Sequence, residues 1–167
     1  MAIIESFAPT TKGVGSPEGK VAAPVGSIYT DTTATNGAIR WIKSSGAGNT
    51  GWKVEYGDTG WRDITPESIT SGAMLIRRVG NTVMLSLRAI VFTYQSLGRL
   101  PSGFYSPNVF LPAKPITADG FTLFIFTDNN GYTSYQTTTP GDSSPMIGSA
   151  TYFTDSAWPA TLPGTPA

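Results

Sequence analysis

Hydrophobic and polar residues alternate with a period of two in several short stretches, which is the pattern of a β-strand with one buried face. Residues 52–56 alternate between large apolar and charged side chains. Over residues 82–91 the odd positions form one apolar face, which we expect to be core, and the even positions form a mixed face. No segment longer than about two turns has helical periodicity. The pattern therefore predicts an all-β protein.

Further strands are expected where apolar runs are bounded by turn residues. Asn36-Gly37 is typical of a tight turn with a positive φ angle, and Gly80-Asn81 joins two strands of an expected hairpin. The run 121–127 is apolar on both faces, with Phe124 and Phe126 on the same side. Such a strand is either central in a sandwich or faces another subunit, so Phe124 and Phe126 are candidates for an oligomer interface. The other expected strands are 27–30, 38–43, 61–64, 74–79, 132–136 and 146–153.

The spacing of these segments divides the chain into three parts. Residues 1–25 lack periodicity and are interrupted by glycine and proline, which indicates an extended arm. Residues 26–64 predict a small Trp-rich β-hairpin module, and 65–167 predict an antiparallel β-sandwich that is jelly-roll-like. The three prolines between Trp158 and Ala167 indicate that this tail is neither a helix nor a central strand.

Composition narrows the classes of partner. Lysine plus arginine and aspartate plus glutamate each number 11, so no basic excess favours nucleic acid. No apolar run is long enough to span a bilayer, and the first residues lack the pattern of a signal peptide. Charged residues make up only 13% of the chain, and a neutral, charge-poor surface is prone to association. We therefore expect much of the surface to be covered by copies of the chain or by partner chains.

Candidate chemistry is sparse. The chain has no histidine and no cysteine, so the usual proton shuttle and the most easily activated nucleophile are missing. Carboxylate pairs such as Asp58 with Asp63, or Asp128 with Asp142, resemble the pairs of glycosidases, but Asp58 and Asp128 occupy turn positions, where an aspartate bonds its own backbone. The run Asp128–Gly131 offers oxygen ligands, but it lacks the spaced acidic residues of a calcium loop. We expect a non-enzymatic protein with no metal and no cofactor.

Aromatic residues offer contact surfaces instead. Trp41, Trp52 and Trp61 give the small module a large contact area, either as its internal core or at an interface around a symmetry axis. In the larger domain, aromatic residues lie in or beside the connections, and such faces suit sugars and proteins alike. Tyr132, Tyr135 and Trp158 are the candidates for contact with a glycan receptor.

Four segments resemble a module of known proteins. The runs Ala23–Asp31, Asn36–Lys43, Gly48–Trp52 and Tyr56–Arg62 resemble a module in minor tail proteins and tail fibres of phages that infect actinobacteria. The runs 76–83 and 158–164 look like the distal domain that follows this module there. Family members often have a collagen-like or longer shaft ahead of the module, whereas here only a short arm precedes it.

The resemblance implies a trimeric virion structural protein on the particle surface, involved in host attachment and bound to other virion proteins. Ile3, Ile4 and Phe7 of the arm are then candidates for anchoring the protein to the particle. Because the shaft is missing, a trimeric capsid decoration protein stays open as an alternative. A stand-alone carbohydrate-binding module is a second alternative.

Overall fold

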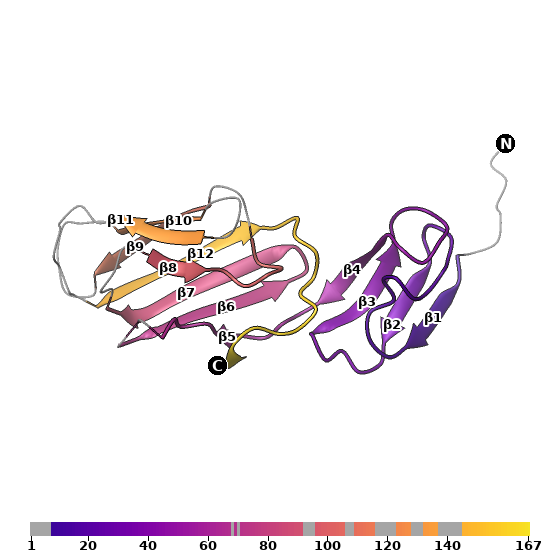
Figure 1. Ribbon diagram of the computed structural model, residues 1–167, viewed down its shortest axis with the longest axis horizontal. Coiled ribbons are helices and arrows are strands. Elements are labelled where there is room, and N and C mark those ends of the chain that lie inside the picture. Colours follow the sequence, from indigo (N-terminus) through magenta and orange to yellow (C-terminus); the bar gives the residue numbers. More distant parts are fainter. Residues whose placement is uncertain are drawn as a thin grey trace. The chain divides into compact units, whose positions relative to one another are not determined.

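The computed structural model describes residues 8–167 except 68, 70, 92–95, 106–108, 116–122, 128–131 and 137–144. For residues 96–98, 109–115, 123–127, 132–136 and 146 it describes the backbone only. Within these limits every regular element is a β-strand and there is no helix, which confirms the all-β prediction (Figure 1). The chain forms two compact units, Met1–Asp58 and Thr59–Ala167.

The first unit contains one sheet with strand order β1-β2-β3-β4. Its strands are β1 (Thr10–Gly13), β2 (Ile28–Asp31), β3 (Ala38–Lys43) and β4 (Trp52–Gly57). β1 runs parallel to β2, and the other neighbours are antiparallel. The expected turn before β3 is present: Gly37 has a φ of 79°, and its N–H donates to the carbonyl of Ala34 at 2.8 Å.

The expected arm over residues 1–25 needs correction, because its described part is built into the first unit. Residues 10–13 form β1, and the segment that follows is bonded to the loop before β4. The Glu18 carboxylate accepts hydrogen bonds from the N–H groups of Gly51 and Trp52 at 3.1 and 2.7 Å. A glycine- and proline-rich segment without periodicity is thus ordered by pairing with another segment, which periodicity does not detect.

The module boundary expected at residue 64 also moves, to the peptide between Asp58 and Thr59. β5 (Arg62–Asp63) pairs with β6 (Ala73–Val79) and so belongs to the second unit. The N–H of Thr59 donates to the carbonyl of Arg78, within the same unit. A two-residue strand is too short to reveal its partner by periodicity.

The second unit has one long sheet with strand order β13-β5-β6-β7-β12-β9-β10-β11-β8. β12 and β9 pair over only three residues, Gly148 to Met146 against Ala113 to Pro115. Leu100 and Phe104, which follow β8 at one end of this order, pack against β6 and β7. The sheet therefore turns back over itself into two layers, consistent with a β-sandwich (Figure 1). The remaining strands are β7 (Thr82–Ile90), β8 (Ser96–Arg99), β9 (Val109–Pro115), β10 (Leu123–Thr127), β11 (Tyr132–Gln136), β12 (Met146–Phe153) and β13 (Thr165–Pro166).

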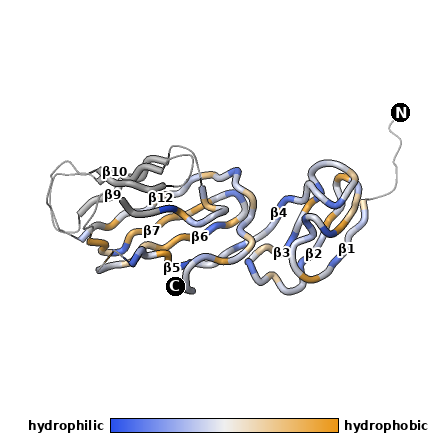
Figure 2. The backbone as a smooth tube through the Cα atoms, viewed as in Figure 1, coloured by the Kyte–Doolittle hydropathy of each residue, from blue (hydrophilic) through white to orange (hydrophobic). Residues whose placement is uncertain are grey.

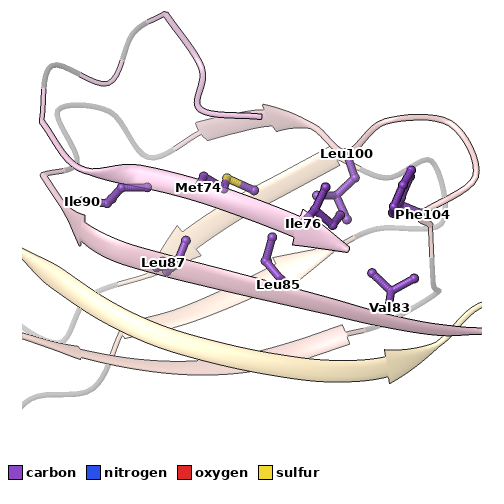
Figure 3. Packing of buried hydrophobic residues seen from close by; sticks show 8 residues of the cluster. All are labelled: Met74, Ile76, Val83, Leu85, Leu87, Ile90, Leu100 and Phe104. Atoms are coloured by element: carbon purple, nitrogen blue, oxygen red, sulfur yellow. The ribbon is translucent and has the colours of Figure 1, made fainter. Parts of the chain in front are cut away.

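Cross-strand rows on β6, β7 and β12 build the core of this unit. Leu85 is the direct cross-strand partner of both Ile76 and Ala150. In Figure 2 the hydrophobic positions of β6 and β7 appear as orange stretches of the backbone tube. Figure 3 shows Leu100 and Phe104 near Ile76, closing the core from the other layer. The buried cluster is Met74, Ile76, Val83, Leu85, Leu87, Ile90, Leu100 and Phe104.

The alternation expected through residue 91 is wrong at its end, because β7 contains a bulge. Ala89 has a φ of 49°, and the pairing shifts so that Leu87 faces Gly148 while Ile90 faces Met146. The extra residue reverses the faces beyond it. Ile90, expected on the mixed face, is therefore fully buried in the core.

The sequence pattern did not predict four of the described strands: β1, β8, β9 and β13. The first two and the last are short, and β9 contains two prolines, Pro112 and Pro115, that obscure it. β13 lies at the edge of the sheet, which confirms that the tail is not a central strand. β10, expected over 121–127, lies between β9 and β11 and is not an edge strand.

Candidate contact surface

Arg78 donates hydrogen bonds to four backbone carbonyls of the second unit. It is only 3% exposed and lies on the inner face of β6. Its Nε donates to the Gly80 carbonyl at 2.8 Å, and Nη1 donates to the carbonyls of Gly103 and Ala157. Nη2 donates to the Ser156 carbonyl at 3.0 Å. One guanidinium thus joins the β6–β7 turn, the turn after β8 and the segment after β12.

The partners of Arg78 are neutral carbonyl groups. Burial lowers the pKa of Arg78 to about 10, so the guanidinium remains charged at neutral pH. Val83 of β7 pairs with Arg78 on one side and with Tyr152 on the other, so the three residues lie in one cross-strand row. Burial raises the pKa of Tyr152 above its ordinary value. The Tyr152 hydroxyl donates to the Phe104 carbonyl at 2.8 Å. Both side chains therefore serve the interior of the unit.

Trp158, a predicted glycan contact, is half-buried. The centre of its ring lies 4.9 Å from the Arg78 guanidinium carbon, which is a cation–π arrangement. One side of the indole is therefore used within the protein, and a ligand would meet only what remains exposed.

Phe153 is the aromatic side chain of this unit that projects furthest into solvent among the described residues, with 78% of its surface exposed. It follows the half-buried Tyr152 on β12, so period-two alternation sends one ring inward and the next outward. Aromatic residues near connections were expected to offer contact surfaces, but Phe153 was not among the candidates selected from the sequence. The alternation along β12 would have been the signal.

Phe153 belongs to the outer face of β7 and β12, which we define by seven residues. Phe153 is paired with Thr82, Thr151 with Met84, and Ser149 with Ser86. Arg88 extends the face along β7. Phe153, Thr151, Ser149 and Arg88 are exposed, and the other three are half-buried. The outer face is Thr82, Met84, Ser86, Arg88, Ser149, Thr151 and Phe153; it contains no carboxylate.

The three tryptophans of the expected module do not share one role. Trp41 and Trp52 are 6% and 5% exposed within the first unit, so its own residues cover them. The indole N–H of Trp52 donates to the Val21 carbonyl at 2.8 Å, whereas the Trp41 indole nitrogen is buried without a hydrogen bond. Trp61 is half-buried and belongs to the second unit. Of the two interpretations, core fits Trp41 and Trp52.

Two of the carboxylates in the described part serve turns. Asp31 is buried and accepts from Gly15 N–H, Thr33 N–H and the Thr33 hydroxyl at 2.9 to 3.0 Å. Burial alone would raise the pKa of Asp31, but these bonds outweigh it and hold the pKa below 3.8. Asp63 accepts from the hydroxyl and N–H of Thr65, which also lower its pKa. These contacts explain both residues as turn-forming groups.

Several predicted site residues fall outside what the structure describes. Ile3, Ile4 and Phe7 lie outside the described residues, and so does Asp128. Phe124 and Phe126 lie on β10, and Tyr132 and Tyr135 on β11, but only their backbones are described. The pairing of β10 with β11 places Ile125 opposite Tyr135. Their proposed contacts stay predictions.

In the described part of the chain, no three acidic residues gather closely enough to hold a metal ion. The same part contains no helix long and apolar enough to cross a membrane. No protein-family model matches the chain, and no curated protein matches it either.

Proposed function

We propose that this protein is a non-enzymatic structural protein of a bacteriophage virion, exposed on the particle and involved in attachment to the host surface. The observation that supports it most is the resemblance of residues 23–62 to the module of minor tail proteins and tail fibres. Under this proposal the protein is a homotrimer that contacts other virion proteins.

The placement of the resembling residues supports a shared fold more than a shared binding site. Those that are buried include Tyr29, Asp31, Ala38, Trp41 and Trp52. They fill the interior of the first unit, where they fix the sheet and its turns. A module whose resembling residues lie in its interior is suited to serve as a connector, the neck of a spike, while another surface serves recognition.

The second unit is then the outward head, a jelly-roll-like β-sandwich. Its exposed aromatic residue Phe153 and the half-buried Trp158 offer contact area at the surface. Its strand β10 supplies Phe124 and Phe126, for which we propose a place between subunits. A tail location fits attachment to the host better than a capsid location does.

The oligomeric state is the first test. Light scattering during size-exclusion chromatography should give three times the 17.6 kDa of one chain at micromolar concentration. Phe124→Asp should reduce this mass to that of one folded chain if the residue lies between subunits. A wild-type protein that stays monomeric argues against the trimer.

The location is the second test. Gold-labelled antibodies raised against the purified protein should mark one fixed position, at the tail, on phage particles prepared from the source of the gene. Label on the head surface would transfer the proposal to capsid decoration, and particles without label would overturn it.

A further inference from the structure

From the outer face of β7 and β12 we infer a binding site for an acidic polysaccharide. The inference rests on the proposed function and gives it a ligand class: a polymer of uronic acids that lies along the two strands. The polymer would contact Phe153 at one end of the face and Arg88 towards the other.

The chemistry of the face favours a sugar polymer. Thr82, Ser86, Ser149 and Thr151 supply four hydroxyl groups in three successive cross-strand rows: Ser149 faces Ser86, Thr151 faces Met84, and Thr82 faces Phe153. Hydroxyl groups exchange hydrogen bonds with sugar hydroxyls, and the exposed Phe153 ring can stack on the apolar face of a pyranose. An extended polysaccharide can also bind along an exposed sheet face without a cavity.

Charge complementarity selects an acidic sugar. Arg88 is exposed, and its guanidinium can bind a carboxylate through two parallel hydrogen bonds. The strands β6, β7 and β12 contain no aspartate or glutamate. An acidic ligand on this face therefore meets a positive group and no negative group from these strands.

The residues of the outer face are too polar to favour a second copy of the chain as its binding partner. Of the seven residues of the outer face, only Met84 and Phe153 are large and apolar. Permanent subunit interfaces are more apolar than this, and a face rich in hydroxyl groups suits a hydrated ligand. The trimer contact proposed above concerns β10, a different strand of the sheet.

The length of the face suits a polymer. Thr82, opposite Phe153, and Arg88 are six residues apart on β7, which corresponds to about 20 Å along a strand. A single sugar cannot contact both ends at once. We therefore expect affinity to rise with chain length until the ligand spans both residues.

Affinity electrophoresis with alginate, a polyuronate, tests the inference on the full chain. The protein should be retarded by alginate and not by neutral dextran, and added salt should weaken the effect. Arg88→Gln and Phe153→Ser should each weaken binding about fivefold to tenfold with an unchanged melting temperature. Arg40→Gln is the matched control, since Arg40 is an exposed arginine of the first unit.

Three results would overturn the inference: no retardation by alginate at low salt, equal weakening by Arg40→Gln and Arg88→Gln, or equal affinity for a uronic acid disaccharide and for long oligomers. Failure here and failure of the proposed function are distinguishable. If the protein is found on phage particles but does not bind alginate, only the proposed binding site is refuted. If it binds alginate but is missing from phage particles, only the virion role is refuted.

Discussion

The Arg78 guanidinium lies 4.9 Å from the centre of the Trp158 ring while donating hydrogen bonds to the carbonyls of Ser156 and Ala157 just before it. One side chain of β6 thus holds both the backbone and the ring of the segment after β12. Any contact made by Trp158 depends on this arrangement.

Arg78→Lys should destabilise the protein by about 2–4 kcal/mol, because one ammonium cannot reach carbonyls in three segments and leaves some of them buried without a donor. Urea denaturation measures the change. Arg62→Lys is the comparison, since Arg62 also donates to two carbonyls, those of Pro163 and Gly164, but is partly exposed. Its cost should be about 1 kcal/mol, and equal costs would contradict the central role of Arg78.

Asp31→Asn should weaken the first unit by about 1–2 kcal/mol at neutral pH, because the charged carboxylate accepts several hydrogen bonds in a buried site. The pKa of Asp31 is lowered by folding, so its contribution is complete well above pH 3.8 and is lost as the pH falls through the folded pKa. Thermal unfolding at several pH values should show the wild-type advantage shrinking below pH 3.8. A constant advantage down to pH 2 would show that charge is not its source.

Gly51→Ala should destabilise the loop before β4 by at least about 1 kcal/mol. Gly51 has a φ of 92°, and an added Cβ would lie 2.4 Å from the Ser45 carbonyl oxygen. Gly48→Ala in the same loop is the control, because a Cβ there meets nothing within 4 Å. Calorimetry of both variants should show a lower melting temperature for Gly51→Ala alone.

Glu18→Gln should cost about 1 kcal/mol, since an amide oxygen and an amide nitrogen cannot both accept from Gly51 and Trp52 as the carboxylate does. Hydrogen exchange should show faster exchange of these two amides. Glu55→Gln breaks the exposed ion pair with Arg40 and serves as the control, with little expected effect. Unchanged amide protection in Glu18→Gln would mean that residues 17–23 are held by other bonds.

Strands with clear alternation could be predicted from sequence, and β3, β4, β7 and β12 begin and end within a residue or two of the expected positions. β1 could not, because four residues, TTKG, with little apolar character carry no periodic signal and are held by pairing with β2. The bulge at Ala89 was equally hidden, since an alanine gives no sign that its φ will be positive.

The sequence predicted that aromatic residues would form a contact surface, but not which of them would be exposed. Aromatic residues near connections were expected to mark it, but which ring points outward depends on the register of β12 against β7. The register places the Phe153 side chain in solvent. The Trp158 ring instead packs against Arg78, a residue 80 positions earlier, and no local sequence pattern indicates this contact.

The pairing of β13 with β5 has a consequence for biosynthesis. Arg62 donates to the carbonyl of Pro163, 101 positions later, so a nascent polypeptide cannot complete this sheet until the ribosome has added that stretch. The contacts of the β1–β4 sheet all fall within residues 10–57, so this sheet can assemble while translation continues. Premature termination shortly before residue 163 would therefore release a molecule whose first unit is complete and whose second unit lacks β13 and its pairing with β5.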